Sequence, residues 1–140
     1  MSDPRHLLLW PVLAQIGLTF ALYAWLSAAR LLAVRSGEVR YACFELGREE
    51  PVRIARITRN LANQFELPVI VFACVLLLVA FDAVRMFDVW AGWIFVAGRV
   101  VHCGVQTLTD DVPLRGRVFL INAVGCAMLV GHLGLVALGG

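Results

Sequence analysis

The stretch RNLANQFELPVIVFACVLLLVAF, residues 59–81, places an unbroken apolar run directly after a group of polar residues. A run like that at residues 69–81 has to be buried in a protein core or placed in a bilayer. The whole chain of 140 residues is 61% hydrophobic and 16% charged, with a mean hydropathy of +0.82. Charged surface is too scarce to cover a water-soluble protein of this size, so the composition indicates a membrane protein.

Four segments are long enough to cross a bilayer, because a hydrocarbon core about 30 Å thick needs about 20 apolar residues per helix. The first exceeds the core of a signal peptide and follows MSDPRH, which lacks a basic lead-in, so it is interpreted as a retained span. We expect one domain over residues 1–140 and an all-α fold, an integral membrane four-helix bundle with up-down topology. The expected spans are residues 7–33, 61–81, 89–108 and 118–138.

The basic residues predict the orientation of the spans. All twelve are arginines, and most of them lie at one end of the expected bundle. Because connections rich in positive charge stay on the cytoplasmic side, we expect the connections at 34–57 and 109–117 to be cytoplasmic and both termini to lie opposite. The arginines at that end are Arg35, Arg40, Arg48, Arg53, Arg56, Arg59, Arg115 and Arg117, against Arg5 and Arg85 at the other.

Polar side chains form a stripe where the second span begins. At about 100° per residue, Arg59, Asn63 and Glu66 fall within an arc of about 60° on one helix face. The third span repeats the pattern at spacings i, i+3 and i+7, and the first span carries a looser polar face. These further residues are Arg99, His102 and Gln106 in the third span, and Gln15, Thr19, Tyr23 and Arg30 in the first.

Charged groups in this position need partners, since each costs at least ~2.5–3.5 kcal/mol in hydrocarbon on insertion scales. The expected partner of Glu66 is Arg99 or Arg59. Such pairs could serve only to hold the helices together. However, the arginines outnumber the glutamate once the nearby Arg115 is included, and an excess of buried donors favours an anionic ligand.

The residue types suggest the chemistry of that ligand. Arginine forks bind carboxylates through two parallel hydrogen bonds, asparagine suits an amide, and a glutamate can hold an ammonium group. A peptide-like zwitterion with two carboxylates, an amine and amide bonds would satisfy the whole set.

Other reactive residue types are interpreted as structural. The four cysteines show no CxxC spacing, which favours small apolar filler over a redox or metal role, and no metal site is expected. His132 is interpreted as an interfacial or packing group. Asp110 and Asp111 are interpreted as turn and cap residues, with proton transfer beside Arg115 as the alternative. The residues expected to permit close helix packing in the fourth span are Gly125, Gly131 and Gly134, with Ala127.

Two segments together carry a resemblance to a known family. RITRNLANQFELP, residues 56–68, and GRVVHCGVQTLTDDVPLRGR, residues 98–117, resemble the MAPEG family, the membrane-associated proteins of eicosanoid and glutathione metabolism. The resemblance covers all four spans, with its motifs between residues 36 and 122. It is closest to a bacterial-type member of the branch of microsomal glutathione transferase, prostaglandin E synthase and leukotriene C4 synthase.

The resemblance implies a set of site residues. The arginine, asparagine and glutamate of the family's second helix bind glutathione, and arginine and histidine of GRVVH also reach the tripeptide. The arginine of SGEVR approaches the same ligand, and the arginine of VPLR stabilises the thiolate. Arg115 is therefore the implied catalytic residue, and the implied glutathione-binding residues are Arg59, Asn63, Glu66, Arg99, His102, Arg40, Gln106 and Arg30.

The resemblance also implies a homotrimer with the thiol site between subunits. The expected function is that of a glutathione-dependent transferase or peroxidase acting on lipophilic electrophiles. The expected partners are glutathione as co-substrate, a lipophilic small molecule, membrane lipid and further copies of the chain, but no nucleic acid. A non-catalytic lipid- or glutathione-binding member of the family remains an alternative. A small four-span transporter ranks third, because such proteins usually centre on an acidic residue in the first span and this first span has none.

Overall fold

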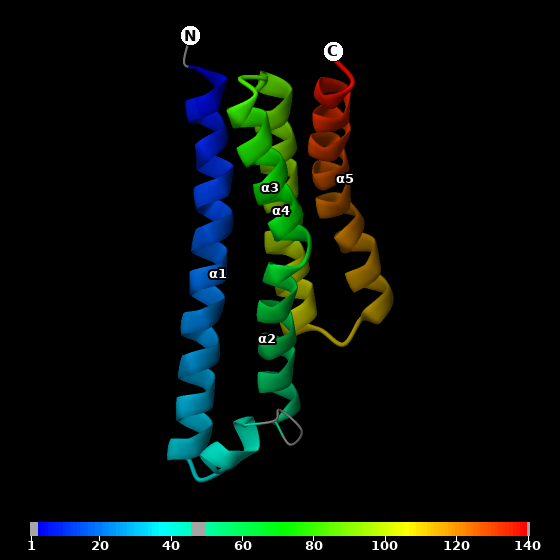
Figure 1. Ribbon diagram of the computed structural model, residues 1–140. Coiled ribbons are helices and arrows are strands. Elements are labelled where there is room, and N and C mark those ends of the chain that lie inside the picture. The colour runs from blue at the N-terminus through cyan, green and yellow to red at the C-terminus, as the bar shows by residue number, and fades with distance from the viewer. Residues whose placement is uncertain (1–2, 46–49, 140) are drawn as a thin grey trace.

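The computed structural model describes residues 3–45 and 50–139, and regular structure in this part of the chain is entirely helical. Four long rods run alternately up and down, and α2, η2 and α3 follow one another in a single rod (Figure 1). The all-α bundle expected from the sequence is therefore confirmed. The elements are α1 (Pro4–Arg35), the 3-10 helix η1 (Tyr41–Phe44), α2 (Val52–Ala62), the 3-10 helix η2 (Asn63–Phe65), α3 (Leu67–Ala80), α4 (Met86–Leu108) and α5 (Val112–Ala137).

The second rod is interrupted inside the polar stretch that opens residues 59–81. α2 ends at Ala62, and Glu66 has φ −101° and ψ −102°, outside the helical range, before α3 begins. The cause is Pro68, which has no N–H to donate and whose ring collides with the carbonyl four residues earlier. The regular helix expected over 61–81 is therefore wrong at this point, and Glu66 does not follow the 100° spacing that the polar stripe assumed.

The fourth rod begins earlier than the sequence suggested. Asp111 caps it by accepting a hydrogen bond from the Leu114 N–H at 2.7 Å, so the helix starts at Val112 rather than at residue 118. The connection expected at 109–117 is correspondingly short. Arg115 therefore lies in the first turn of α5, where the helix fixes the direction of its side chain.

Three rods are long and apolar enough to cross a membrane: Pro4–Arg35, Val52–Ala80 and Val112–Ala137. α4 spans about 35 Å at 1.5 Å per residue but is less apolar, because it carries buried polar residues such as Arg99 and His102. It packs against α1, α2 and α5, which shield these groups from lipid. α4 is therefore the polar inner helix of the bundle.

The tightest helix contact joins α4 to α5. A Cβ added at Gly98 would lie 2.5 Å from the Asn122 backbone nitrogen, and one at Gly125 would lie 2.6 Å from the Phe95 backbone nitrogen. Gly125 thus permits the close approach expected of it. At two further glycines expected to do the same, Gly131 and Gly134, an added Cβ would meet no atom of the described residues within 4 Å, so within the subunit that expectation is wrong.

Both chain ends lie at one end of the bundle, and the connection between α1 and α2 lies at the other (Figure 1). This agrees with the up-down topology expected from the spans. Arg48, counted among the orienting arginines, falls outside the described residues.

Candidate functional site

Two sets of polar side chains on α2 and η2 face in different directions. The inner set is Asn60 and Gln64, which are 0% and 2% exposed. The Asn60 amide donates to the Cys103 carbonyl at 3.1 Å and to the Thr107 hydroxyl at 2.8 Å. The Gln15 amide of α1 donates to Gln64 Oε1 at 2.8 Å. Because lipid offers no hydrogen bonds, polar groups here bond to one another, and these bonds fasten α1 to η2 and α2 to α4.

The outer set is centred on Asn63. Its Nδ2 donates to Gln106 Oε1 at 2.9 Å, and its backbone carbonyl accepts a hydrogen bond from Arg99 Nη2 at 3.1 Å. Arg99 and Gln106 are 1% and 4% exposed, whereas Arg59, one turn before Asn63, is exposed. Asn63 thus connects buried polar groups of α4 with the open face of α2.

Glu66 does not form the ion pair expected of it. Within residues 3–45 and 50–139, no arginine nitrogen lies at ion-pair distance from its carboxylate, and the side chain is exposed. The backbone break before Pro68 takes Glu66 out of helical register, and Arg99 is bound to the Asn63 carbonyl instead. The Glu66 carboxylate still lies near enough to Arg99 for an electrostatic attraction, without an ion pair at 4 Å or less in the described residues.

A cavity of about 100 Å³ opens where α2, the end of α4 and the start of α5 meet. α2 contributes Arg56 and Arg59, which lie one turn apart on the same face. Gln106 comes from α4, and Arg115 comes from α5. Three of the predicted site residues, Arg59, Gln106 and Arg115, therefore line one space, although they are up to 56 positions apart in the chain.

Two aspartates at this cavity offset part of its positive charge. Arg56 forms an ion pair with Asp110, and Asp111 is the N-cap of α5. Arg59 and Arg115 have no carboxylate partner in the described part of the chain. These two guanidinium groups are therefore available to an anionic ligand.

His102 lies one turn from Arg99 and one turn from Gln106 on α4, and it is buried. Its ring meets the Phe119 ring of α5 edge to face, with the centroids 5.8 Å apart. The Nδ1 atom of His102 has no hydrogen-bond partner among the described residues. His102 is not among the residues that line the cavity of Arg59 and Arg115.

Arg30 is engaged elsewhere. Its guanidinium pairs with Glu50, donates to the Thr58 hydroxyl at 3.2 Å and lies over the Phe44 ring, 4.9 Å from the centroid. Thr58 in turn donates to Glu50 at 2.8 Å. Arg30 therefore ties the first connection and α2 to α1, and the structure does not bring it to the cavity of Arg59 and Arg115.

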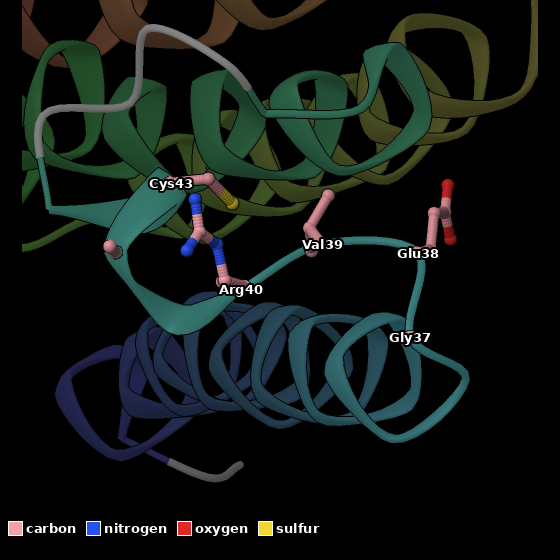
Figure 2. A pocket seen from close by; sticks show the side chains of 6 residues that line it. Gly37, Glu38, Val39, Arg40 and Cys43 are labelled. Atoms are coloured by element: carbon pink, nitrogen blue, oxygen red, sulfur yellow. The ribbon is translucent and has the colours of Figure 1, made fainter.

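Arg40 lines a separate cavity of about 430 Å³ in the first connection. Arg40 and Cys43 lie at one end of the row of labelled side chains, and Glu38 lies at the other (Figure 2). Glu38 is paired with Arg53 of α2. Within one subunit, Arg40 is therefore not grouped with the other predicted ligand-binding residues.

Sequence interpretation missed the inner polar pair. Asn60 and Gln64 are spaced i, i+4, which places them on one helix face, and this signal could have revealed a second polar stripe. Periodicity alone gives no reason to choose which stripe faces the bundle and which faces outward.

Comparison with protein-family models decides the family. The model of the MAPEG family matches residues 8–135, nearly the whole chain. The chain belongs to the MAPEG family. No curated protein and no solved structure matches it.

MAPEG membership and the three long apolar rods together indicate an integral membrane protein of a family concerned with glutathione-related transfer and lipid metabolism. The family match includes every residue of the arginine-lined cavity. No group of three or more histidine, cysteine or acidic side chains suited to a metal ion occurs among the residues that the structure describes. The cavity of this MAPEG protein is lined by guanidinium groups, the Gln106 amide, the Thr109 side chain and the carboxylates of Asp110 and Asp111.

Proposed function

We propose that this MAPEG protein is a membrane-embedded, glutathione-dependent transferase or peroxidase that acts on lipophilic electrophiles through a thiolate stabilised by Arg115. One observation carries the proposal: Arg59, Gln106 and Arg115, from three helices, line one cavity, and the two arginines lack carboxylate partners among the described residues. Glutathione, with two carboxylates and an ionisable thiol, is an anion that suits such a cavity.

Each residue type has a counterpart in the tripeptide. The exposed Arg59 suits a carboxylate, which it can bind through two parallel hydrogen bonds. Asn63 and Gln106, bonded to each other, offer their remaining donors and acceptors to the peptide groups. Glu66 suits the ammonium group. Arg99 holds the Asn63 backbone and so keeps the binding surface in place.

Arg115 would act on the sulfur. A free thiol has a pKa of ~8.5 and is mostly protonated at neutral pH, whereas a neighbouring guanidinium favours the thiolate, which is the nucleophile. The thiol proton leaves to solvent, the sulfur attacks an electrophilic carbon, and the new S–C bond forms as the leaving group departs or a strained ring opens. With a hydroperoxide, the thiolate attacks the terminal oxygen, the O–O bond breaks, and the alkoxide takes a proton from solvent and leaves as an alcohol. A second glutathione thiol then converts the sulfenic acid to a disulfide and water.

A homotrimer would complete the site. The cavity of about 100 Å³ is small beside the ~300–1,000 Å³ typical of small-molecule pockets, and Arg59 and Glu66 are exposed on the subunit. Exposed charges within a bilayer are costly, and a neighbouring subunit would both cover them and enlarge the pocket. Arg40, which lies in its own cavity in the first connection, could then reach the ligand from an adjacent chain.

The trimer predicts a particle mass three times that of the 15.4 kDa chain. Gel filtration with light scattering in a mild detergent, corrected for bound detergent, measures this mass directly. A monomeric particle that retains full glutathione binding would contradict a site shared between subunits.

The arginine-rich end of the bundle is proposed to face the cytoplasm. This places the connections at 34–57 and 109–117 on that side and both termini opposite, in line with the positive-inside rule. The cytoplasm is also the compartment in which glutathione keeps thiols reduced, so the co-substrate would be available at the cavity.

Replacing Arg59 with alanine is expected to weaken glutathione binding by roughly 10- to 100-fold, because a hydrogen bond to a charged group contributes about 1.5–3 kcal/mol. Calorimetric titration of the detergent-solubilised protein gives the Kd. Arg53→Ala is the matched control, since Arg53 lies on the same helix but pairs with Glu38 away from the cavity. Equal Kd values for the two variants would argue against the proposed ligand site.

A further inference from the structure

A buried ionisable pair lies at the opposite end of the bundle from the first connection, near the chain ends. Asp88, in the first turn of α4, is fully buried and accepts a hydrogen bond from the Arg85 backbone N–H at 2.7 Å. Its other oxygen is 2.7 Å from Nδ1 of His132, on α5. The two residues are 44 positions apart, so only the packing of α4 on α5 brings them together.

The second ring nitrogen of His132 has no such partner. His132 is 7% exposed, and its Nε2 is buried without a hydrogen-bond partner among the described residues. A buried polar atom that lacks a partner carries a free-energy cost, which a ligand can relieve. The bond to Asp88 fixes the ring, so Nε2 is held in one direction.

His132 also lines a cavity of about 680 Å³ on the surface of α4 and α5. The floor is built from residues of α5 such as Ala127, Gly131 and Leu135, which are spaced four apart and form one row about 12 Å long. No described atom would lie within 4 Å of a Cβ at Gly131, so this glycine leaves open space rather than a helix contact. The floor of the cavity is apolar.

Arg85 stands on the wall of the same cavity. Within the described residues no carboxylate pairs with its guanidinium, whereas Arg5, also at this end, is paired with both Asp3 and Asp82. The cavity therefore combines an unpaired cation, a buried imidazole nitrogen and an apolar row.

We infer that this cavity is a second ligand site of the protein, one that binds a long-chain fatty acid with its carboxylate between Arg85 and His132 and its alkyl chain along α5. A carboxylate has two oxygens, one for the guanidinium and one for Nε2–H of a His132 ring that carries a proton on both nitrogens and donates Nδ1–H to Asp88. His132 lies about 8 Å from the end of α5 at Ala137, a depth at which a headgroup meets the acyl region. The volume falls within the range of a site for one small molecule, which favours a single-chain acid over a two-chain phospholipid.

The test is the binding of tritiated palmitate to the full-length protein in detergent, with unlabelled palmitate, hexadecanol and phosphatidic acid as competitors. Palmitate is expected to compete, and the other two are not. Arg85→Gln is expected to weaken palmitate binding at least tenfold, whereas Arg5→Gln is not. Equal competition by hexadecanol, or unchanged binding in Arg85→Gln, would overturn the assignment of a carboxylate site, and preferential competition by phosphatidic acid would overturn the choice of a free acid.

Two further variants separate a ligand site from a structural pair. His132→Asn can keep a donor to Asp88 but removes Nε2, so it is expected to weaken palmitate binding at least tenfold while the protein still elutes from gel filtration as the wild type does. Gly131→Leu fills the cavity and is expected to abolish binding, while Gly134→Leu, on the same helix and equally unobstructed, is not. Binding unchanged in Gly131→Leu would overturn the proposal.

The same cavity could instead be covered by a second copy of the chain. Gly131→Cys chains that cross-link to each other under mild oxidation would show this and would overturn the fatty-acid site. Glutathione affinity is expected to be unchanged in all of these variants, because the site lies at the other end of α4 from the cavity of Arg59 and Arg115. A failure of either proposal is therefore distinguishable from a failure of the other.

Discussion

Replacing Arg115 with alanine is expected to lower the rate of glutathione transfer by roughly 10²–10³-fold, while the Kd of glutathione changes far less. The guanidinium is proposed to act on the sulfur, where negative charge develops when the thiol ionises. Arg59 is proposed to hold the peptide through its carboxylate. Loss of Arg115 should therefore appear mainly in turnover, and loss of Arg59 mainly in binding.

Two measurements check this expectation. Conjugation of glutathione to a lipophilic aryl halide gives the rate, and the ultraviolet absorbance of the bound thiolate reports whether the sulfur is ionised. Arg117→Ala is the matched control, because Arg117 is an exposed arginine on the same helix that does not line the cavity. The conjugation rate and the thiolate absorbance should both fall in Arg115→Ala and remain at the wild-type level in Arg117→Ala.

Arg115 lies in the first turn of α5, which holds its backbone in place. The rate of glutathione transfer is therefore expected to depend on the shape of this side chain as well as on its charge. Arg115→Lys keeps the charge but loses the planar fork, so partial activity is expected. An undiminished thiolate signal in Arg115→Ala would reject the catalytic role. Glutathione binding without turnover in the wild-type protein, tested against several electrophiles, would favour the non-catalytic alternative within the family.

Enlarging Gly125 is expected to produce the largest loss of stability. A Cβ there would lie 2.6 Å from the Phe95 backbone nitrogen and 2.7 Å from the Ala91 carbonyl oxygen. Backbone atoms in the middle of α4 cannot rotate away, so α4 and α5 must separate. Gly125→Ala is expected to lower the free energy of unfolding by about 1–3 kcal/mol, and Gly125→Leu is expected to prevent accumulation of monodisperse protein.

A loss of stability in Gly125→Ala would be informative, because alanine favours a helix over glycine by about 1 kcal/mol. Helix propensity alone would therefore make the variant more stable. Gly134→Ala, on the same helix with open space around it, should therefore be neutral or stabilising. Thermal unfolding in detergent, followed by gel filtration, gives the comparison. Equal behaviour of Gly125→Ala and Gly134→Ala would contradict the close approach of α4 and α5.

The sequence by itself determined the class of this protein and the order of its four long rods, but not where the helices begin and end. An apolar run such as residues 69–81 indicates a membrane helix through its composition and length alone. This signal does not depend on which other helices pack against it. The two motif segments, residues 56–68 and 98–117, also predicted the MAPEG family, and the family match confirms it. The residues proposed to bind and activate glutathione came from these segments, apart from Arg40.

Only the tertiary structure decided which polar residues of α2 face the interior of the bundle and which face outward. Neighbours such as Arg59 and Asn60 differ by only about 100° in direction, and which one faces the bundle depends on where α1 and α4 lie. Asn60 meets Cys103 and Thr107 in the interior, while Arg59 stays on the open face beside Arg115.

The same reason explains the pairs that the sequence predicted wrongly or missed. Glu66 was expected to form an ion pair with Arg99 or Arg59, but a backbone break before Pro68 removed it from the helical register. Asp88 and His132 meet although 44 positions separate them. Local patterns fix which residues share a helix face, whereas partners on different helices are chosen by the packing of the whole bundle.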